Sequence, residues 1–200
     1  MAERRTTSRL ADFNREFPRL LARTKHPLRA HLVSVAQLAA DLAKRHGGDP
    51  AAAAAAGYLH DWLKPLSRSR LKRIFLRLRV PMCPSTERAP ALWHGPAAAA
   101  LARRSLGLKH PDALAAIRWH TTGRPRASLV ERAVFVADYC AAGRGFREAG
   151  AGRKLATRSL DLATRYVLAG KLAHLQSKAV RPHPASLAFW RKLFSRTRHG

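Results

Sequence analysis

Apolar residues recur at steps of three and four along most of this chain, and this periodicity constrains the fold more than any other feature. In the segment between Pro27 and Gly47-Gly48 the apolar positions are Leu28, Leu32, Val35, Leu38 and Leu42. No segment alternates between apolar and polar residues as a half-buried strand does, and no internal repeat is present. The periodicity therefore predicts an all-α fold, a helical bundle in a single domain.

Local signals indicate where several of these helices begin. Asp49-Pro50 is typical of an N-cap followed by the first helical position, and the alanines at 51–56 are strong helix formers. Ser128 and Glu131 match a capping box. We expect the three-proline segment 81–90 to be a flexible loop that covers a site. We also expect a loop at 147–154, with helices following near 157–176 and 186–195.

The length of 200 residues suits one domain with a sizeable core. We expect residues 1–25 to form a basic N-terminal segment with a short helix, and residues 26–195 to form the domain. No apolar run reaches the roughly 20 residues of a membrane span. Cys83 and Cys140 are too few and too far apart to indicate a disulfide framework or a cysteine zinc site. These features predict a cytoplasmic protein, a monomer or a homodimer, that does not bind a membrane.

The charge is unusual, because 38 Lys and Arg residues against 12 Asp and Glu residues give a net charge of +26. A positive field of this size attracts nucleotides, polyphosphates and RNA. Arginine occurs in nearly every segment, however, so a general compositional bias explains the charge equally well. A nucleic-acid partner stays open without being favoured, and we expect the main partner to be a small nucleotide.

Histidines and aspartates near helix ends or on inner faces form the series His31, His60-Asp61, His94, His120 and Asp138. His60 and Asp61 are adjacent at a helix end, so both can reach one cation. Mixed imidazole and carboxylate ligands suit Fe, Mn, Co, Ni or Zn better than Mg. The ligands that we expect are His31, His60, Asp61 and Asp138.

Other residues are placed to act on a phosphate. His94 lies near a helix N-terminus, where amide groups favour an anion. Together with His120 it either holds a second metal bridged by Asp61 or contacts the phosphate directly. Lys64 can place a positive charge on the phosphate, and Arg144 is suited to a bidentate grip. Because a metal polarises phosphoryl oxygens and activates water, the pattern predicts a metal-dependent phosphohydrolase.

Several motifs extend this series. They are Leu-His-Asp-Trp-Leu-Lys at 59–64, Leu-Trp-His-Gly-Pro at 92–96, Ala-Ile-Arg-Trp-His-Thr-Thr-Gly-Arg-Pro at 116–125, and Ala-Asp-Tyr at 137–139 followed by Gly143-Arg144. With these motifs the chain resembles the HD superfamily of metal-dependent phosphohydrolases. More narrowly, it resembles the YqeK-type symmetrical bis(5′-nucleosyl)-tetraphosphatases.

The resemblance implies an HD-type helical bundle and a metal, most often iron with Mn, Co or Ni as alternatives, at the four ligands named above. It implies one such metal, or two, and symmetrical hydrolysis of diadenosine tetraphosphate (Ap4A) to two ADP. It also implies that the 182–187 segment lies near the nucleoside. The implied catalytic residues are Lys64, His94 and His120, and the implied substrate contacts are Lys64, His94, His120, Thr121, Asp138 and Arg144.

Two other interpretations stay open. The same centre could act on a nucleoside mono- or triphosphate, or on a cyclic or alarmone nucleotide. Alternatively, the chain is a non-enzymatic RNA- or ribosome-binding protein in which the His-Asp cluster is structural.

Overall fold

Helices are the only regular secondary structure in the part of the chain that the computed structural model describes, residues 26–142 and 147–195. In order they are α2 (His26–Arg45), α3 (Pro50–Leu59), α4 (Arg68–Leu78), α5 (Pro84–Glu87), the 3-10 helix η1 (Pro90–Leu92), α6 (His94–Ser105), α7 (Pro111–Trp119), α8 (Leu129–Cys140), α9 (Arg147–Arg158), α10 (Leu160–Ser177) and α11 (Pro184–Phe194). This confirms the predicted all-α fold. None of these helices is both long and apolar enough to cross a bilayer. The helix expected within 1–25 lies outside the described residues, and the domain boundaries stay predictions.

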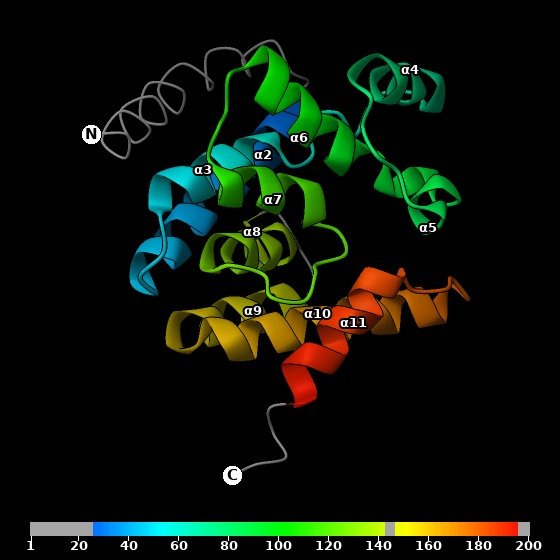
Figure 1. Cartoon of the computed structure of the whole chain (residues 1–200). Helices are drawn as coiled ribbons and strands as arrows, with labels where there is room; N and C mark the ends of the chain where they lie inside the picture. The colour runs from blue at the N-terminus through cyan, green and yellow to red at the C-terminus, as the bar shows by residue number, and fades with distance from the viewer. Residues whose placement is uncertain (1–25, 143–146, 196–200) are drawn as a thin grey trace.

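Two layers of helices cover α8 (Figure 1). On one side, α2 packs against α8 and against α3, while α7 contacts both α3 and α8 and is covered by α6. On the other side, α9 and α10 pack on α8, and α11 contacts α10. Because α8 is enclosed in this way, nearly all of its side chains are buried, including its capping residue Glu131 and its last-turn residue Asp138.

Small residues allow α2 and α3 to approach each other closely. A Cβ atom on Gly57 would lie 2.5 Å from the Cα atom and 2.7 Å from the backbone nitrogen of Ala36, so no side chain fits there. This contact lies in the last turn of α3, directly before His60. The alanine and glycine composition of α3 therefore brings His60 towards α2.

The caps expected from the sequence are present. The Asp49 carboxylate accepts hydrogen bonds from the amides of Ala51 and Ala52 at the start of α3. At the start of α8, Ser128 and Glu131 form a reciprocal capping box. These bonds satisfy amide donors that a helix leaves unpaired at its N-terminus. Local sequence signals thus predicted both helix starts correctly.

The expectation of a loop at 147–154 was wrong, because these residues belong to α9. Gly150 and Gly152 lower the intrinsic helix propensity of the segment and suggested a break. In the structure, however, Gly152 lies directly against the Sγ atom of Cys140 in α8, with no room for a Cβ atom. Glycine here permits helix packing, and tertiary contact outweighs local propensity.

The segment 81–90 is also more regular than the loop expected from its prolines. Pro84 opens α5, which is one helical turn, and Pro90 opens η1. The Trp93 indole nitrogen donates to the Thr86 carbonyl at 2.8 Å, and the Trp93 ring is buried against Phe75. A buried tryptophan therefore ties this segment to the core.

Candidate metal centre

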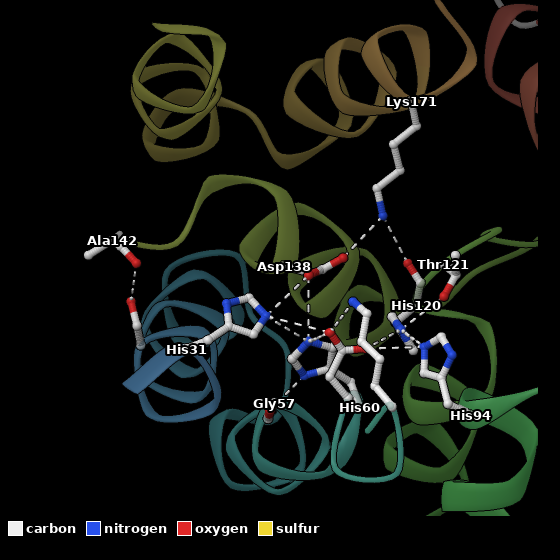
Figure 2. Close-up of polar contacts among 12 residues, drawn as sticks. His31, Gly57, His60, His94, His120, Thr121, Asp138, Ala142 and Lys171 are labelled. Carbon is white, nitrogen blue, oxygen red and sulfur yellow. Dashed lines mark hydrogen bonds and ion pairs between the residues drawn. The ribbon is translucent and has the colours of Figure 1, made fainter. Parts of the chain in front are cut away.

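Six histidine and aspartate side chains from five helices meet at one place (Figure 2). His60 and Asp61 directly follow α3, His120 directly follows α7, and His94 is the first residue of α6. His31 lies within α2, and Asp138 lies in the last turn of α8. The structure therefore brings together every histidine and aspartate singled out from the sequence.

The first group of donor atoms comes from His31, His60, Asp61 and Asp138. The Nε2 atoms of His31 and His60 lie 3.3 Å apart, and Asp138 Oδ1 lies 3.5 Å from each of them. Asp61 Oδ2 lies 3.8 Å and 3.7 Å from the same two nitrogens. Two ligand atoms that are each about 2.1 Å from one ion lie about 3.0 Å apart when the ligand–metal–ligand angle is a right angle. They lie about 3.4 Å apart when that angle is tetrahedral. The group therefore has the spacing of a single metal site after small adjustments.

The second group shares Asp61 with the first and adds His94 and His120. Asp61 Oδ1 lies 3.1 Å from His94 Nε2 and 3.3 Å from His120 Nε2, and these two nitrogens are 3.0 Å apart. Each oxygen of the Asp61 carboxylate thus faces a different pair of imidazoles. Asp61 is the residue that joins the two groups.

Three of the histidines are held in one orientation by the backbone. In each of them Nδ1 lies 2.8–2.9 Å from a carbonyl oxygen three residues earlier. The histidines are His60, His94 and His120, and the carbonyls are those of Gly57, Ala91 and Ile117. We therefore assign the Nδ1–H tautomer, since a carbonyl accepts only from a protonated nitrogen. Each Nε2 then directs its lone pair towards the centre, as a metal ligand does.

This arrangement fits a cation. With Nδ1 protonated, the Nε2 atoms of His94 and His120 are both acceptors and cannot hydrogen-bond to each other. Asp61 Oδ1, which lies between them, is buried and accepts no hydrogen bond of normal geometry from the described residues. Buried lone pairs and carboxylates facing one another are unfavourable unless a positive charge lies among them. The donor set is therefore suited to a divalent metal.

The charges of the centre support the same conclusion. Burial lowers the pKa of His120, and the Asp61 carboxylate raises it. The effect of burial is the larger, so the pKa of His120 is about 4. The Asp61 carboxylate accepts a hydrogen bond from the Lys64 ammonium group at 2.6 Å, which favours its ionised form. For Asp138 the effect of burial is outweighed mainly by the charge of Lys171, and its pKa is well below the usual range. At neutral pH both carboxylates are ionised and His120 is neutral, which are the forms that bind metals.

Lys171 of α10 is a residue of this centre that the sequence reasoning missed. Its Nζ atom donates to Asp138 Oδ2 at 3.3 Å and to the carbonyl oxygen of His120 at 3.1 Å (Figure 2). It also lies 4.3 Å from the centroid of the Phe135 ring. The available signal was its position four residues after Val167, a buried residue, which places Lys171 on the inner face of α10.

Two of the expected substrate contacts lie at the edge of the cluster. Lys64 Nζ donates to Asp61 Oδ2 at 2.6 Å, although the Lys64 side chain is 55% exposed. The Thr121 hydroxyl lies 2.9 Å from His120 Nε2 and, given the tautomer above, donates to it. Arg144 lies outside the described residues. The roles of all three towards a substrate stay predictions.

The loop after His120 is shaped by the Thr-Thr-Gly-Arg-Pro motif. Gly123 has a φ of +65°, and its Cα hydrogen faces the Phe189 ring of α11 with no room for a Cβ atom. Arg124 makes a bidentate pair with Glu131, with distances of 2.7 Å and 2.8 Å. The glycine and arginine of the motif therefore fix the loop between α7 and α8, and with it the position of Thr121.

The 182–187 segment approaches the same loop. The Nε2 atom of His183 lies 3.2 Å from the Thr86 hydroxyl. These two residues line a small cavity together with Thr121, Thr122 and Trp119. The segment expected near the nucleoside is thus next to Thr121, at one side of the metal centre.

Comparison with known proteins gives a family for this chain. The family profile described as HD domain matches residues 28–143. A Bacillus subtilis protein named symmetrical bis(5′-nucleosyl)-tetraphosphatase is 36% identical over 148 residues, covering 74% of this chain and 79% of the relative. A protein of the same name from Halalkalibacterium halodurans is 32% identical over 163 residues, covering 82% and 87%.

A solved structure agrees with these relatives. It is a crystal structure from Clostridium acetobutylicum, described as a predicted HD superfamily hydrolase involved in NAD metabolism. It aligns with a TM-score of 0.84 and 28% identity, covering 94% of this chain and 98% of the other. The helical fold, the clustered histidines and aspartates and these matches lead to one conclusion: the chain belongs to the HD domain family and is a homologue of the symmetrical bis(5′-nucleosyl)-tetraphosphatases.

Proposed function

We propose that this protein hydrolyses a dinucleoside tetraphosphate such as Ap4A symmetrically, giving two ADP. The observation that carries the proposal is the Asp61 carboxylate, whose two oxygens face two separate pairs of imidazoles at ligand spacing. The names of the relatives support the choice of substrate, since these proteins share 32–36% identity with this chain over most of their length.

We propose that His31, His60, Asp61 and Asp138 hold an iron-type ion, with Mn, Co or Ni as alternatives. Such an ion polarises a phosphoryl oxygen and lowers the pKa of a nearby water. The backbone carbonyls that hold the Nδ1 atoms keep the imidazoles oriented before the substrate arrives. His94 and His120 either share Asp61 as ligands of a second ion or contact the phosphate directly.

The surrounding side chains would bind and orient the phosphate chain. Lys64, exposed at the edge of the cluster, can move its ammonium group from Asp61 to a phosphate oxygen. The Thr121 hydroxyl can donate to a second phosphate oxygen instead of to His120. We keep Arg144 as a proposed phosphate contact on the basis of its motif. These donors would lie near the central phosphates, where symmetrical cleavage requires water to attack.

The test is product analysis with a matched control. We expect purified protein with Fe or Mn to convert Ap4A into ADP as the sole nucleotide product. His60→Ala should lose bound metal and at least about a hundredfold in activity, because removing a ligand disrupts the site. His174→Ala, at an exposed position of α10, should behave like the unaltered protein. Formation of AMP with ATP, or preference for another nucleotide in a panel, would contradict symmetrical cleavage.

RNA binding provides the contrast with the non-enzymatic interpretation. If the protein were an RNA-binding protein with a structural cluster, His60→Ala would retain tight RNA binding that falls steeply with salt. We expect instead that the unaltered protein and His60→Ala both bind RNA weakly at 150 mM salt, as measured by fluorescence anisotropy with a labelled oligonucleotide.

A further inference from the structure

A surface groove of about 330 Å³ lies between α6, α7 and the residues that follow α4. Its walls carry four arginines and one large aromatic ring, namely Arg79, Arg103, Arg104, Arg118 and Trp119. Alanine and leucine side chains, such as Ala100 and Leu114, make up much of the remaining surface. No histidine or carboxylate of the metal centre lines this groove.

No carboxylate of the described residues compensates the charge of the groove. Among the described residues, none of its four guanidinium groups makes an ion pair with a carboxylate. Arg118 lies over the Trp119 ring at 5.3 Å and donates to the Pro81 carbonyl at 3.3 Å. Burial lowers the pKa of Arg118, which indicates a partly desolvated cation. An anion in the groove would find several donors already gathered around it.

The dimensions of the groove suit a mononucleotide. Its volume lies within the range of about 300–1,000 Å³ that is usual for small-molecule sites. Along α6 it extends from Pro96 to Arg104, and eight helical steps span about 12 Å. A single-stranded RNA tract occupies a track of about 4–16 nucleotides, which is far longer. The apolar walls, which include the partly buried Trp119, can receive a base or a ribose, while the arginines receive phosphates.

The groove also adjoins the small cavity that lies next to Thr121. Pro96, Arg118 and Trp119 line both the groove and the small cavity that contains Thr121 and His183. Pro96 is two residues after His94, and Trp119 directly precedes His120. A ligand in the groove could therefore be continuous with one at the centre.

We propose that this groove binds a nucleoside diphosphate group, through the guanidiniums of Arg103, Arg104 and Arg118 and the apolar walls. The group is either the second half of a bound dinucleoside tetraphosphate or a separate nucleotide, and the first of these sources rests on the proposed function. The chemistry of recognition is the same in both cases.

The direct test is calorimetric titration of the metal-loaded protein with ADP. We expect two ADP per chain, one at the centre and one in the groove. Arg103→Gln combined with Arg104→Gln should weaken one site at least tenfold, and Ala100→Trp, which fills the groove, should remove the same site. The control is Arg70→Gln with Arg73→Gln on the exposed face of α4, which removes the same charge. One ADP site in the unaltered protein, or equal losses in the test and control variants, would overturn the proposal.

Kinetic measurements distinguish the two sources of the nucleoside diphosphate group, the second half of the substrate and a separate nucleotide. Adenosine tetraphosphate has the same four phosphates as Ap4A but lacks the second nucleoside. If the groove variant raises KM about tenfold for Ap4A and less than twofold for adenosine tetraphosphate, the ligand is the second half of the substrate. If neither KM changes while one ADP site is lost, the ligand is a separate nucleotide.

Two further outcomes separate the groove from the proposed function. Two ADP sites in a protein that cleaves neither substrate would support the groove and contradict the proposed function. Oligo(A) RNA or inorganic tetraphosphate that displaces ADP from the groove with equal affinity would overturn the proposal, because the groove would then recognise phosphate chains and not a nucleotide.

Discussion

Replacing Lys171 by methionine should destabilise the metal-free protein much more than the metal-loaded protein. The Lys171 side chain is 19% exposed and its partner Asp138 is 12% exposed, so the two charges are largely removed from water. Methionine has a similar length and retains contact with the Phe135 ring, but it removes the ammonium group that lies next to the Asp138 carboxylate. A bound metal would supply the missing positive charge on the other oxygen of the same carboxylate.

The size of the effect follows from the burial of the pair. Removing one partner of a buried ion pair costs about 3–5 kcal/mol. We expect the lower end, about 3 kcal/mol, because His31 and His60 also contact Asp138 and Asp138 retains some contact with water. For a domain of this size, 1 kcal/mol changes Tm by about 2–4 °C, which gives a decrease of about 6–12 °C. With metal bound we expect less than half of this decrease.

The assay is thermal unfolding after treatment with a chelator and again after reloading with metal. Lys154→Met, at an exposed position of α9, is the matched control and should change Tm by no more than about 2 °C. In an Asp138→Asn background the Lys171→Met change should lose most of its effect, because no buried carboxylate then needs a cation. If Lys171→Met costs the same with and without metal, or the same in both backgrounds, the charge argument is refuted.

Three further predictions concern packing and protons. In Gly57→Ala the new Cβ atom would lie 2.5 Å from the Cα atom of Ala36, and opening this contact to about 3.4 Å requires α2 and α3 to separate by about 0.9 Å. We expect the free energy of unfolding to fall by about 1–3 kcal/mol. A competition titration should show at least a tenfold loss of metal affinity. Gly123→Ala strains the positive φ and displaces Phe189; we expect a lower Tm and a lower kcat, and an unchanged kcat would contradict the role given to this loop. Burial lowers the pKa of His60, but contact with Asp138 and the charges of Asp61 and Asp138 outweigh this and raise it above its ordinary value. At a pH below that raised pKa, His60 must lose a proton before metal binds, so metal affinity should fall about tenfold for each unit by which the pH decreases. A metal affinity that does not change between pH 5 and 7 would contradict this.

The parts of the fold that follow from local chemistry could be predicted from the sequence. Asp49 with Pro50, and Ser128 with Glu131, marked helix starts because capping depends only on residues a few positions apart. The α9 helix could not be predicted in this way. Its glycine at 152 reflects contact with Cys140, which no local pattern reveals.

The candidate site shows the same division. A single histidine such as His31 does not by itself indicate a metal site. The order of the histidines and aspartates, together with the motifs around them, indicated one. Lys171 carried no motif, and its partner Asp138 is 33 residues earlier in the chain. Only the packing of α10 on α8 brings the two together. The sequence thus indicated the candidate ligands, while the lysine beside them could be found only from the structure.

The most direct test of the account is an anomalous difference map from crystals of the protein purified without added metal, collected at the absorption edge of the metal found by elemental analysis. The account predicts a strong peak among His31, His60, Asp61 and Asp138, with ligand distances of about 2.0–2.2 Å. A second, weaker or equal peak between Asp61, His94 and His120 would identify a two-metal centre. An active crystal with no anomalous peak among these side chains would contradict the central claim that they form a metal centre.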